Sequence, residues 1–219
     1  IVSLWRSCVV ALVAKLLSPR LKLVLFLHST TDAHWLDYCA NRCAAALAHQ
    51  VWADSQATLD QRLPASARDN GLVISFVTRR PETVPAKPVT AAFIFWGRLH
   101  AQKGLDRALG IFSAVHNVDN AARFIIVGPD GGERARIEAL VDTLQLTDAV
   151  QFLGALEFNE ITRHAAVASF YLQTSTHEGM AMSVVEAMQL GLLPVVTPVG
   201  EIARYCRHGK NALLIQNDS

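Results

Sequence analysis

Short apolar runs alternate with amphipathic segments along the whole chain. The runs at residues 91–96 and 123–127 have the length of β-strands and are too short to be buried helices. Between these two runs, apolar residues such as Leu105, Ala108 and Phe112 recur at helical spacing. This alternation is typical of βαβ units, in which helices join parallel strands. The sequence therefore predicts an α/β fold built on parallel sheets.

The same pattern predicts the other elements. We expect strands at 21–27, 51–53, 72–77, 91–96, 123–127, 150–153, 169–172, 193–196 and 212–215. We expect helices at 34–47, from the cap Asp54-Ser55 to about 63, from 104 onward, and at 133–144, 158–166, 183–190 and 201–206. In the helix at 34–47, the face bearing Leu36, Cys39, Ala40 and Cys43 is expected to be the apolar one.

A proline-rich segment divides the chain. Residues 79–88 contain Pro81, Pro85 and Pro88, a composition typical of a linker. We therefore expect two domains, at residues 1–82 and 83–219. The chain opens on Ile1 without an initiator methionine, and a strand-like run lies close to its other end. We expect it to be part of a longer chain.

Composition excludes several classes of function. The formal net charge is +1, which does not favour a nucleic acid as partner. The four cysteines form no Cys-x-x-Cys pair, so we expect small buried hydrophobic residues in a reducing compartment rather than a disulfide framework or zinc site. The apolar run at 8–17 is too short to span a membrane. It predicts a helix buried against a sheet, with a helix lying on a membrane surface as the alternative.

Ligands of parallel α/β sheets bind outside the carboxyl ends of the strands, so the residues that follow each strand are the candidates for a site. Gly97-Arg98 follows one expected strand, and Lys103-Gly104 opens the next helix. Two cations near a helix N-terminus suit a diphosphate, although two surface cations flanking a loop have the same spacing. The turn at 128–132 is rich in glycine but lacks the lysine of a P-loop.

Two carboxylates, Glu178 and Glu186, stand eight positions apart around the start of an expected helix. They could accept hydrogen bonds from the hydroxyls of two sugar rings, while the backbone N–H groups of residues 180–183 face an anion between them. Glu186 as a solvated helix residue is the alternative. Paired carboxylates also occur in glycoside hydrolases, but the two cations favour a ligand that carries phosphate.

The chain resembles the large family of retaining GT-B glycosyltransferases with the E-x7-E motif, the glycosyl transferases group 1. The resemblance spans residues 91–214 in order and rests on short motifs. These are Gly97-Arg98-Leu99, Lys103-Gly104-Leu105-Asp106, Ile125-Ile126-Val127-Gly128, Val150-Gln151-Phe152-Leu153-Gly154, Ser175-Thr176-His177-Glu178-Gly179-Met180, Glu186-Ala187-Met188, Gly191, Pro194-Val195-Val196-Thr197 and Gly200-Glu201-Ile202. Residues 1–82 resemble the end of the family's N-terminal domain, with His28 after a strand and Ala53-Asp54-Ser55 after the next.

The resemblance implies two Rossmann-like domains with parallel sheets, the first of them incomplete here. It implies that Arg98 and Lys103 neutralise the donor diphosphate, that Glu178 binds the donor sugar and Glu186 the ribose, and that His28 faces the sugar. The backbone from Gly154 to Leu156 would meet the base. The implied catalytic residues are His28, Arg98, Lys103 and Glu178. The implied donor-binding residues are Gly97, Arg98, Lys103, Gly128, Gly154, Leu156, Gly179, Met180, Ala181, Met182, Ser183 and Glu186. Many members carry an aromatic residue and a glycine where this chain has Met180 and Ala181, so the chain departs from the family pattern at the sugar pocket.

The expected function is metal-independent transfer of a sugar from a UDP- or GDP-sugar to a glycan, lipid-linked or small acceptor, in polysaccharide or glycoconjugate biosynthesis. No cofactor, metal ion or nucleic-acid partner is expected. We expect a cytoplasmic location at the inner face of the membrane, with a peripheral membrane contact through residues 1–82. The alternatives are a non-catalytic module that binds nucleotide sugars and another GT-B enzyme, such as a nucleotide-sugar epimerase or a phosphorylase.

Overall fold

The computed structural model describes residues 1–74 and 89–215, and these fall into two compact units. The first unit comprises residues 1–74 together with His177–Met180, and the second comprises residues 89–176 and 181–215. Each unit has its own hydrophobic core. The expected linker at 79–88 lies outside the described residues.

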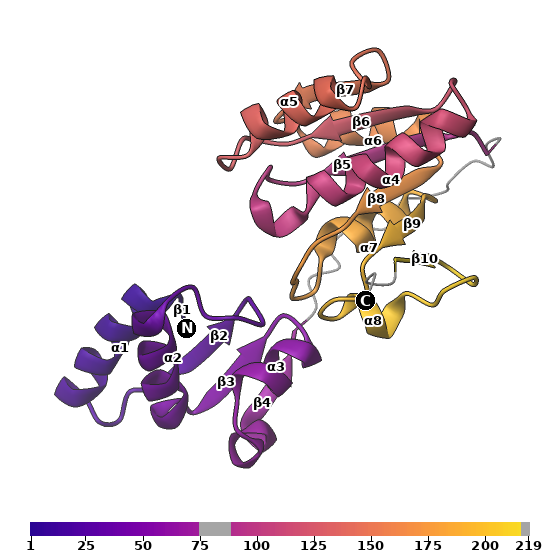
Figure 1. Cartoon of the computed structure of the whole chain (residues 1–219). Coiled ribbons are helices and arrows are strands. Elements are labelled where there is room, and N and C mark those ends of the chain that lie inside the picture. Colours follow the sequence, from indigo (N-terminus) through magenta and orange to yellow (C-terminus); the bar gives the residue numbers. More distant parts are fainter. Residues whose placement is uncertain (75–88, 216–219) are drawn as a thin grey trace. The chain divides into compact units, whose positions relative to one another are not determined.

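The first unit is a four-stranded parallel sheet with the strand order β1-β2-β3-β4. Its elements are β1 (Val2–Ser3), α1 (Trp5–Leu17), β2 (Val24–Leu27), α2 (Trp35–Leu47), β3 (Gln50–Ala53), α3 (Gln56–Arg62), the 3-10 helix η1 (Ala65–Asn70) and β4 (Gly71–Val73). Helices α1 and α2 pack against each other (Figure 1), and α3 packs on β3 and β4. The core of this unit includes Leu25, Val51 and Leu59.

The second unit is a six-stranded parallel sheet with the strand order β10-β9-β8-β5-β6-β7 (Figure 1). Its elements are β5 (Ala92–Trp96), η2 (Ala101–Lys103), α4 (Leu105–Val118), β6 (Arg123–Val127), α5 (Arg134–Thr143), β7 (Val150–Gly154), α6 (Phe158–Val167), β8 (Phe170–Gln173), α7 (Met182–Gln189), β9 (Leu193–Val196), α8 (Ile202–Tyr205) and β10 (Leu213–Leu214).

The strand order of the second unit reverses beside β5. The chain moves outward from β5 to β7 and then returns past β5 to β8, so β5 and β8 are neighbours. Right-handed crossovers therefore place α4 and α6 on opposite faces of the sheet, as Figure 1 shows. In such folds the ligand binds at the carboxyl ends of the strands where the order reverses. That position lies at the ends of β5 and β8.

The expected burial of α1 against a sheet is partial: Cys8 belongs to one core cluster with Leu25 and Leu27 of β2. The helix also packs on α2, and its buried residues are Cys8 and Ala11. Its remaining apolar side chains surround the helix instead of forming one stripe, so Val10, Leu16 and Leu17 are 69, 78 and 83% exposed. None of the helices in the described part of the chain is long and apolar enough to cross a membrane.

The expected apolar face of α2 is wrong except at Ala40, which is buried. Its buried stripe contains Asp37, Ala40, Asn41 and Ala44, whereas Cys39 and Cys43 are exposed. The two polar residues tolerate burial because they satisfy each other: Asn41 Nδ2 donates to Asp37 Oδ1 over 2.7 Å. Of the four cysteines, only Cys8 and Cys206 are the buried small residues expected for all of them.

Candidate functional site

Three glycines lie together at the carboxyl edge of the larger sheet. Gly97 follows β5, Gly128 follows β6, and Gly154 ends β7. The N–H of Gly128 donates to the carbonyl of Gly154 over 2.7 Å, and a Cβ built on Gly128 would overlap the carbonyl oxygen of Gly97. Residues without side chains at this edge let a ligand approach the backbone closely.

The two expected cations lie beside Gly97. Arg98 is exposed, and its aliphatic part lies against Gly131, where an added Cβ would meet Arg98 Cγ at 2.8 Å. Lys103, at the end of η2, is half-buried, and its Cε lies 3.8 Å from the Cβ position of Gly97. Among the described residues, no carboxylate pairs with Arg98. This edge therefore offers a positive charge to an anionic ligand.

The turn that holds Lys103 is tied to the loop after β8. Gly104 adopts a left-handed conformation with φ 61°, and a Cβ there would overlap the carbonyl of Thr174. The Thr174 hydroxyl donates to the carbonyl of Gly104, and the N–H of Thr176 donates to the carbonyl of Gln102 over 2.9 Å. These bonds fix the turn at the point where the strand order reverses.

Helix α7 opens beside the same strand ends. Ala181 precedes it in a left-handed conformation, with φ 54°, and its methyl group is buried. The first N–H groups of a helix have no partner within the helix and carry partial positive charge. Ser183 in this first turn donates from Oγ to Gln173 Oε1 over 3.0 Å, which joins the turn to the end of β8. Met182 and Ser183 are half-buried.

Glu186 lies one turn further along α7 and is half-buried. Its Oε2 accepts a hydrogen bond of 3.0 Å from the indole Nε1 of Trp96, the last residue of β5. The structure thus brings Glu186 to the end of the strand that leads into Gly97 and Arg98. Leu156, two residues after Gly154, is half-buried against the core of the same unit.

Other expected site residues belong to the first unit. Glu178 is 8% exposed, with Gly179 and Met180 following it in the segment grouped with that unit. His28 follows β2 and is exposed, with its ring 4.3 Å from that of Phe26. Partial removal from water lowers the pKa of His28, and the carboxylate of Asp54 opposes this shift. His28 can therefore act as a neutral hydrogen-bonding group near neutral pH.

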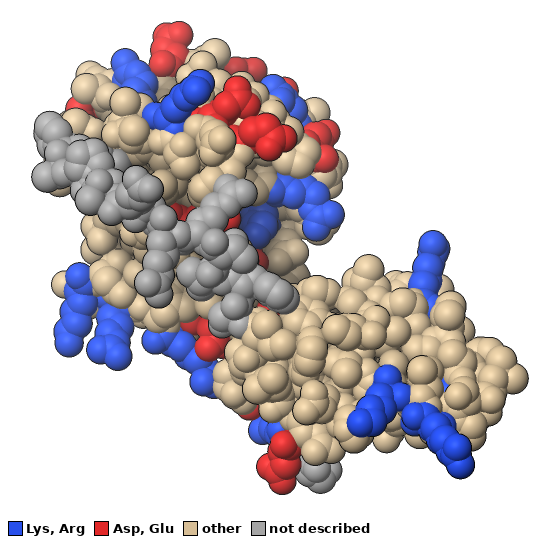
Figure 2. Space-filling model, turned by 180° about the vertical axis from the view of Figure 1, so that it is seen from behind, with Lys and Arg blue, Asp and Glu red and all other residues tan. Residues whose placement is uncertain are grey.

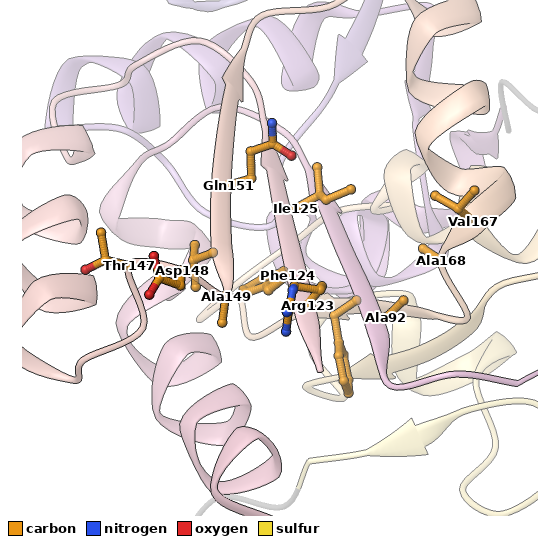
Figure 3. A pocket seen from close by; sticks show the side chains of 12 residues that line it. Ala92, Arg123, Phe124, Ile125, Thr147, Asp148, Ala149, Gln151, Val167 and Ala168 are labelled. Atoms are coloured by element: carbon orange, nitrogen blue, oxygen red, sulfur yellow. The ribbon is translucent and has the colours of Figure 1, made fainter. Parts of the chain in front are cut away.

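One cavity lies away from these residues. It has a volume of about 580 Å³ and is lined by the starts of β5, β6 and β7, including Ala92, Arg123 and Val150 (Figure 3). It therefore opens at the amino ends of the strands, opposite the edge at which parallel sheets bind their ligands. None of the expected site residues lines it. We therefore take the carboxyl edge, and not this cavity, as the candidate site.

Sequence reasoning misses a group of buried polar residues beneath this site. Trp96, Tyr171, Gln173 and Thr174 are each at most 5% exposed and contact one another or the site residues. A signal is present in the sequence, since each of them lies in a strand or directly follows one. Residues within an apolar strand are assigned to the core. Their hydrogen-bonding groups are then overlooked.

Similar proteins were found by sequence and by structure. The profile of the family described as Glycosyl transferases group 1 matches residues 80–219. One subunit of the human phosphatidylinositol N-acetylglucosaminyltransferase is 36% identical over 105 residues, which are 48% of this chain and 22% of that protein. The GDP-mannose:cellobiosyl-diphosphopolyprenol alpha-mannosyltransferase of Xanthomonas oryzae pv. oryzae is 23% identical over 151 residues, 68% of this chain and 39% of that protein.

Solved structures share the fold. Anabaena Alr3699/HepE, in complex with UDP and glucose, superposes with a TM-score of 0.78 at 22% identity, over 97% of this chain and 62% of that one. TarM of S. aureus, with UDP among its ligands, gives a TM-score of 0.74 at 19% identity, over 90% of this chain and 41% of that one. The chain thus spans less than two thirds of the relatives it matches, and these matches establish a GT-B α/β fold with parallel sheets. By the family profile, the chain belongs to the glycosyl transferases group 1.

Proposed function

We propose that this chain carries the donor-binding half of a retaining glycosyltransferase, which transfers a sugar from a nucleotide sugar to a glycan, lipid-linked or small acceptor. The observation that carries this proposal is the glycine-lined strand edge with Arg98 and Lys103 beside Gly97. Because Arg98 has no carboxylate partner among the described residues, its charge is available to a diphosphate.

The two cations have a direct role in the proposed reaction. Cleavage of the bond between the sugar and the diphosphate leaves negative charge on the departing nucleotide, and this charge must be stabilised. We assign that task to Arg98, Lys103 and the N-terminus of α7. The sequence has no Asp-x-Asp motif, and we propose that the reaction does not depend on a metal ion.

The carboxylates divide the recognition of the donor between them. We assign the ribose hydroxyls to Glu186, which accepts a hydrogen bond from Trp96 at the end of β5, directly before Gly97 and Arg98. We assign hydroxyls of the donor sugar to Glu178 and a contact with that sugar to His28. The backbone from Gly154 to Leu156 is assigned to the base.

The donor we propose is a UDP- or GDP-sugar. HepE structures contain UDP or UDP-glucose, and the Xanthomonas relative is named for GDP-mannose. The names of two relatives also point to lipid-linked acceptors, a phosphatidylinositol and a diphosphopolyprenol. We therefore favour an acceptor of this kind for the whole protein, in glycoconjugate or polysaccharide assembly at the inner face of the membrane.

A peripheral membrane contact through the first unit would serve such an acceptor. Residues 1–31 contain four Lys or Arg residues and no acidic one, and α1 exposes several apolar side chains. Figure 2 shows that the face of this unit turned to the viewer is largely uncharged with scattered Lys and Arg. Basic and apolar residues together favour an anionic membrane surface.

Two substitutions test the assignment of the carboxylates. Glu186→Ala should weaken the binding of UDP or GDP about 10- to 100-fold, because hydrogen bonds to a charged group contribute about 1.5–3 kcal/mol. Glu178→Ala should chiefly reduce turnover in the full-length protein. Isothermal titration and a transfer assay measure the two effects, with Glu138→Ala on the outer helix α5 as the control for lost charge.

Two results would contradict the proposal. Unchanged nucleotide affinity in Glu186→Ala would refute its assignment to the ribose. If UDP- and GDP-sugars bind to the full-length protein but no acceptor is ever glycosylated, the chain is instead a module that binds nucleotide sugars without catalysis.

A further inference from the structure

Trp96 lies at the carboxyl edge of the larger sheet, beside the residues that we assign to the donor, and has no role assigned so far. It ends β5, directly before Gly97 and Arg98, and is 5% exposed. Its indole N–H is the only polar group of its side chain and can only donate. The acceptor it meets is Glu186 Oε2, at 3.0 Å, ninety positions along the chain.

A second set of contacts holds the Trp96 ring and backbone in place. The Tyr171 ring packs edge-on against the indole with 4.5 Å between centroids. The Tyr171 hydroxyl lies 3.1 Å from the carbonyl oxygen of Trp96 and 2.7 Å from Gln173 Oε1, and these two acceptors share its proton. Gln173 Oε1 also accepts from Ser183 on α7. Trp96 and helix α7 are therefore joined twice, from the indole through Glu186 and from the Trp96 carbonyl through Tyr171 and Gln173.

A single bond from the indole leaves most of the carboxylate available. An ionised carboxylate offers about four lone-pair positions on two oxygens, all of them acceptors. Among the described residues, no other hydrogen bond to the Glu186 carboxylate is formed, so the lone pairs of Oε1 are not used by the protein. Glu has several rotatable bonds whose freedom opposes binding, and the indole restricts them before the ligand arrives.

We propose that Trp96 is a positioning residue, which holds the Glu186 carboxylate in the orientation that accepts two neighbouring ribose hydroxyls of the donor nucleotide. This inference rests on the proposed function of Glu186. Trp96 itself does not touch the ribose in this arrangement. It acts by fixing one carboxylate oxygen so that the other faces the ligand.

A purely structural Trp96 would use Glu186 only as an acceptor for a buried N–H. A positioning role of Trp96 predicts that its loss weakens recognition of the ribose hydroxyls, whereas a purely structural role does not. We would titrate the full chain with UDP and GDP and with their 2′,3′-dideoxy counterparts, and take the ratio of the two dissociation constants for the nucleotide that binds more tightly. In Trp96→Phe we expect this ratio to fall about 3- to 10-fold, with the affinity for the dideoxy nucleotide almost unchanged.

Two matched variants act as controls. Trp52→Phe removes another indole donor, which bonds Gln50 Oε1 over 3.2 Å in the first unit, and should leave the ratio unchanged. Tyr171→Phe removes the hydroxyl that bonds the Trp96 carbonyl but keeps the bond between the indole and Glu186, so it should lower the ratio less than Trp96→Phe does. A fall in the ratio in Trp52→Phe would overturn the inference, as would an unchanged ratio in Trp96→Phe.

A measurement on the unmodified chain does not depend on the folding of Trp96→Phe. The chain has four tryptophans, and substituting Trp5, Trp35 and Trp52 by Phe assigns the remaining indole N–H signal in an NMR spectrum. UDP or GDP should shift the Trp96 signal, and the dideoxy nucleotide should shift it much less. Equal shifts with both ligands would overturn the inference.

These outcomes separate the inference from the function on which it rests. If neither UDP nor GDP binds the unmodified chain, the proposed donor site is wrong and the inference falls with it. If Glu186→Ala abolishes the preference for the ribonucleotide but Trp96→Phe keeps it, the donor site stands and only the role of Trp96 is refuted.

Discussion

Gly128 allows the ends of β5 and β6 to approach each other closely at the carboxyl edge of the larger sheet. Its φ of 146° is one that side chains rarely adopt, and a Cβ would overlap the carbonyl oxygen of Gly97. Backbone strain and overpacking each contribute about 1–3 kcal/mol. We therefore expect Gly128→Ala to lower the free energy of unfolding by about 2–4 kcal/mol in urea titrations, and to weaken nucleotide binding because the ends of β5 and β6 must separate.

Gly110 is the matched control for this prediction. It lies exposed on helix α4, where an added Cβ would meet no atom within 4 Å. Because alanine has the higher helix propensity, Gly110→Ala should raise the free energy of unfolding by about 0.5–1 kcal/mol. A similar loss of stability in both variants would show that the tight approach of Gly97 and Gly128 is not the cause.

His28 allows a test of electrostatics at the level of one residue. Partial burial lowers the pKa of its imidazole and the Asp54 carboxylate raises it, the first effect being the larger. An NMR titration should place the pKa of His28 below 6.5, and Asp54→Asn should lower that pKa further. A rise in the pKa of His28 in this variant would show that Asp54 does not act on the ring through its charge.

The lowered pKa of His28 determines how this residue makes the stability of the fold depend on pH. The folded state binds the proton less readily than the unfolded chain, so the contribution of His28 to stability is present above the unfolded pKa and is lost as pH falls through the folded pKa. Asp54→Asn should make that loss at acidic pH slightly steeper.

Helix α3 depends on a cap that the sequence predicts. Ser55 precedes the helix, is fully buried, and accepts a hydrogen bond from the N–H of Thr58 over 3.1 Å. Removing such a cap costs about 0.5–2 kcal/mol, so Ser55→Ala should lower the thermal midpoint of the first unit. Ser18→Ala, at an exposed helix end, should not. Equal effects of the two variants would argue against capping.

The regular elements can be predicted where local pattern decides them. Strands β6 and β9 have the predicted bounds, because each is a short apolar run closed by Gly or Thr. Strand β1 escapes prediction because it has only two residues and is held by its pairing with β2. The predicted buried face of α2 is wrong because the hydrogen bond between Asp37 and Asn41, which makes their burial tolerable, has no signature in hydrophobicity.

The same limit applies to the candidate site. Gly97, Arg98, Lys103 and Glu186 can be named from the sequence because each follows a strand or lies on the helix behind one, and parallel strands bring their ends to one edge. The role of the Trp96 indole cannot be predicted from the sequence, because its bond to Glu186 joins two elements that are distant in sequence. A tryptophan in a strand is interpreted as core, and only the structure shows where its N–H points.

At the scale of the whole molecule, the two units share one arrangement. In both, a parallel sheet brings chemically active residues to its carboxyl edge: His28 and Asp54 follow β2 and β3 in the first unit, and Gly97 and Gly128 follow β5 and β6 in the second. Each core also encloses one buried cysteine, Cys8 in the first unit and Cys206 in the second. Because each thiol lies in one core, its ionisation affects the stability of one unit only.

Burial raises the pKa of Cys8 to about 11, with a contribution from Asp37, and raises the pKa of Cys206 to about 11. The pKa of each thiol is higher in the folded chain than in the unfolded chain. The contribution of the two protonated thiols to the free energy of unfolding is therefore present below pH 9 and is lost as pH rises towards 11. We expect each thiol to account for on the order of 2 kcal/mol of this loss. Urea titrations between about pH 8 and 10.5 should show it, and Cys8→Ala or Cys206→Ala should reduce its pH dependence in one unit each.

Thiol reactivity provides the independent check on that prediction. At about pH 8 a disulfide reagent should modify exposed Cys39 and Cys43 rapidly and leave Cys8 and Cys206 unmodified until the chain is unfolded, because reaction requires an accessible thiolate. Cys39→Ser and Cys43→Ser should remove the fast phase without changing the alkaline loss of stability. If all four thiols react at one rate in the folded chain, neither buried cysteine is enclosed by its core and the predicted pH dependence loses its basis.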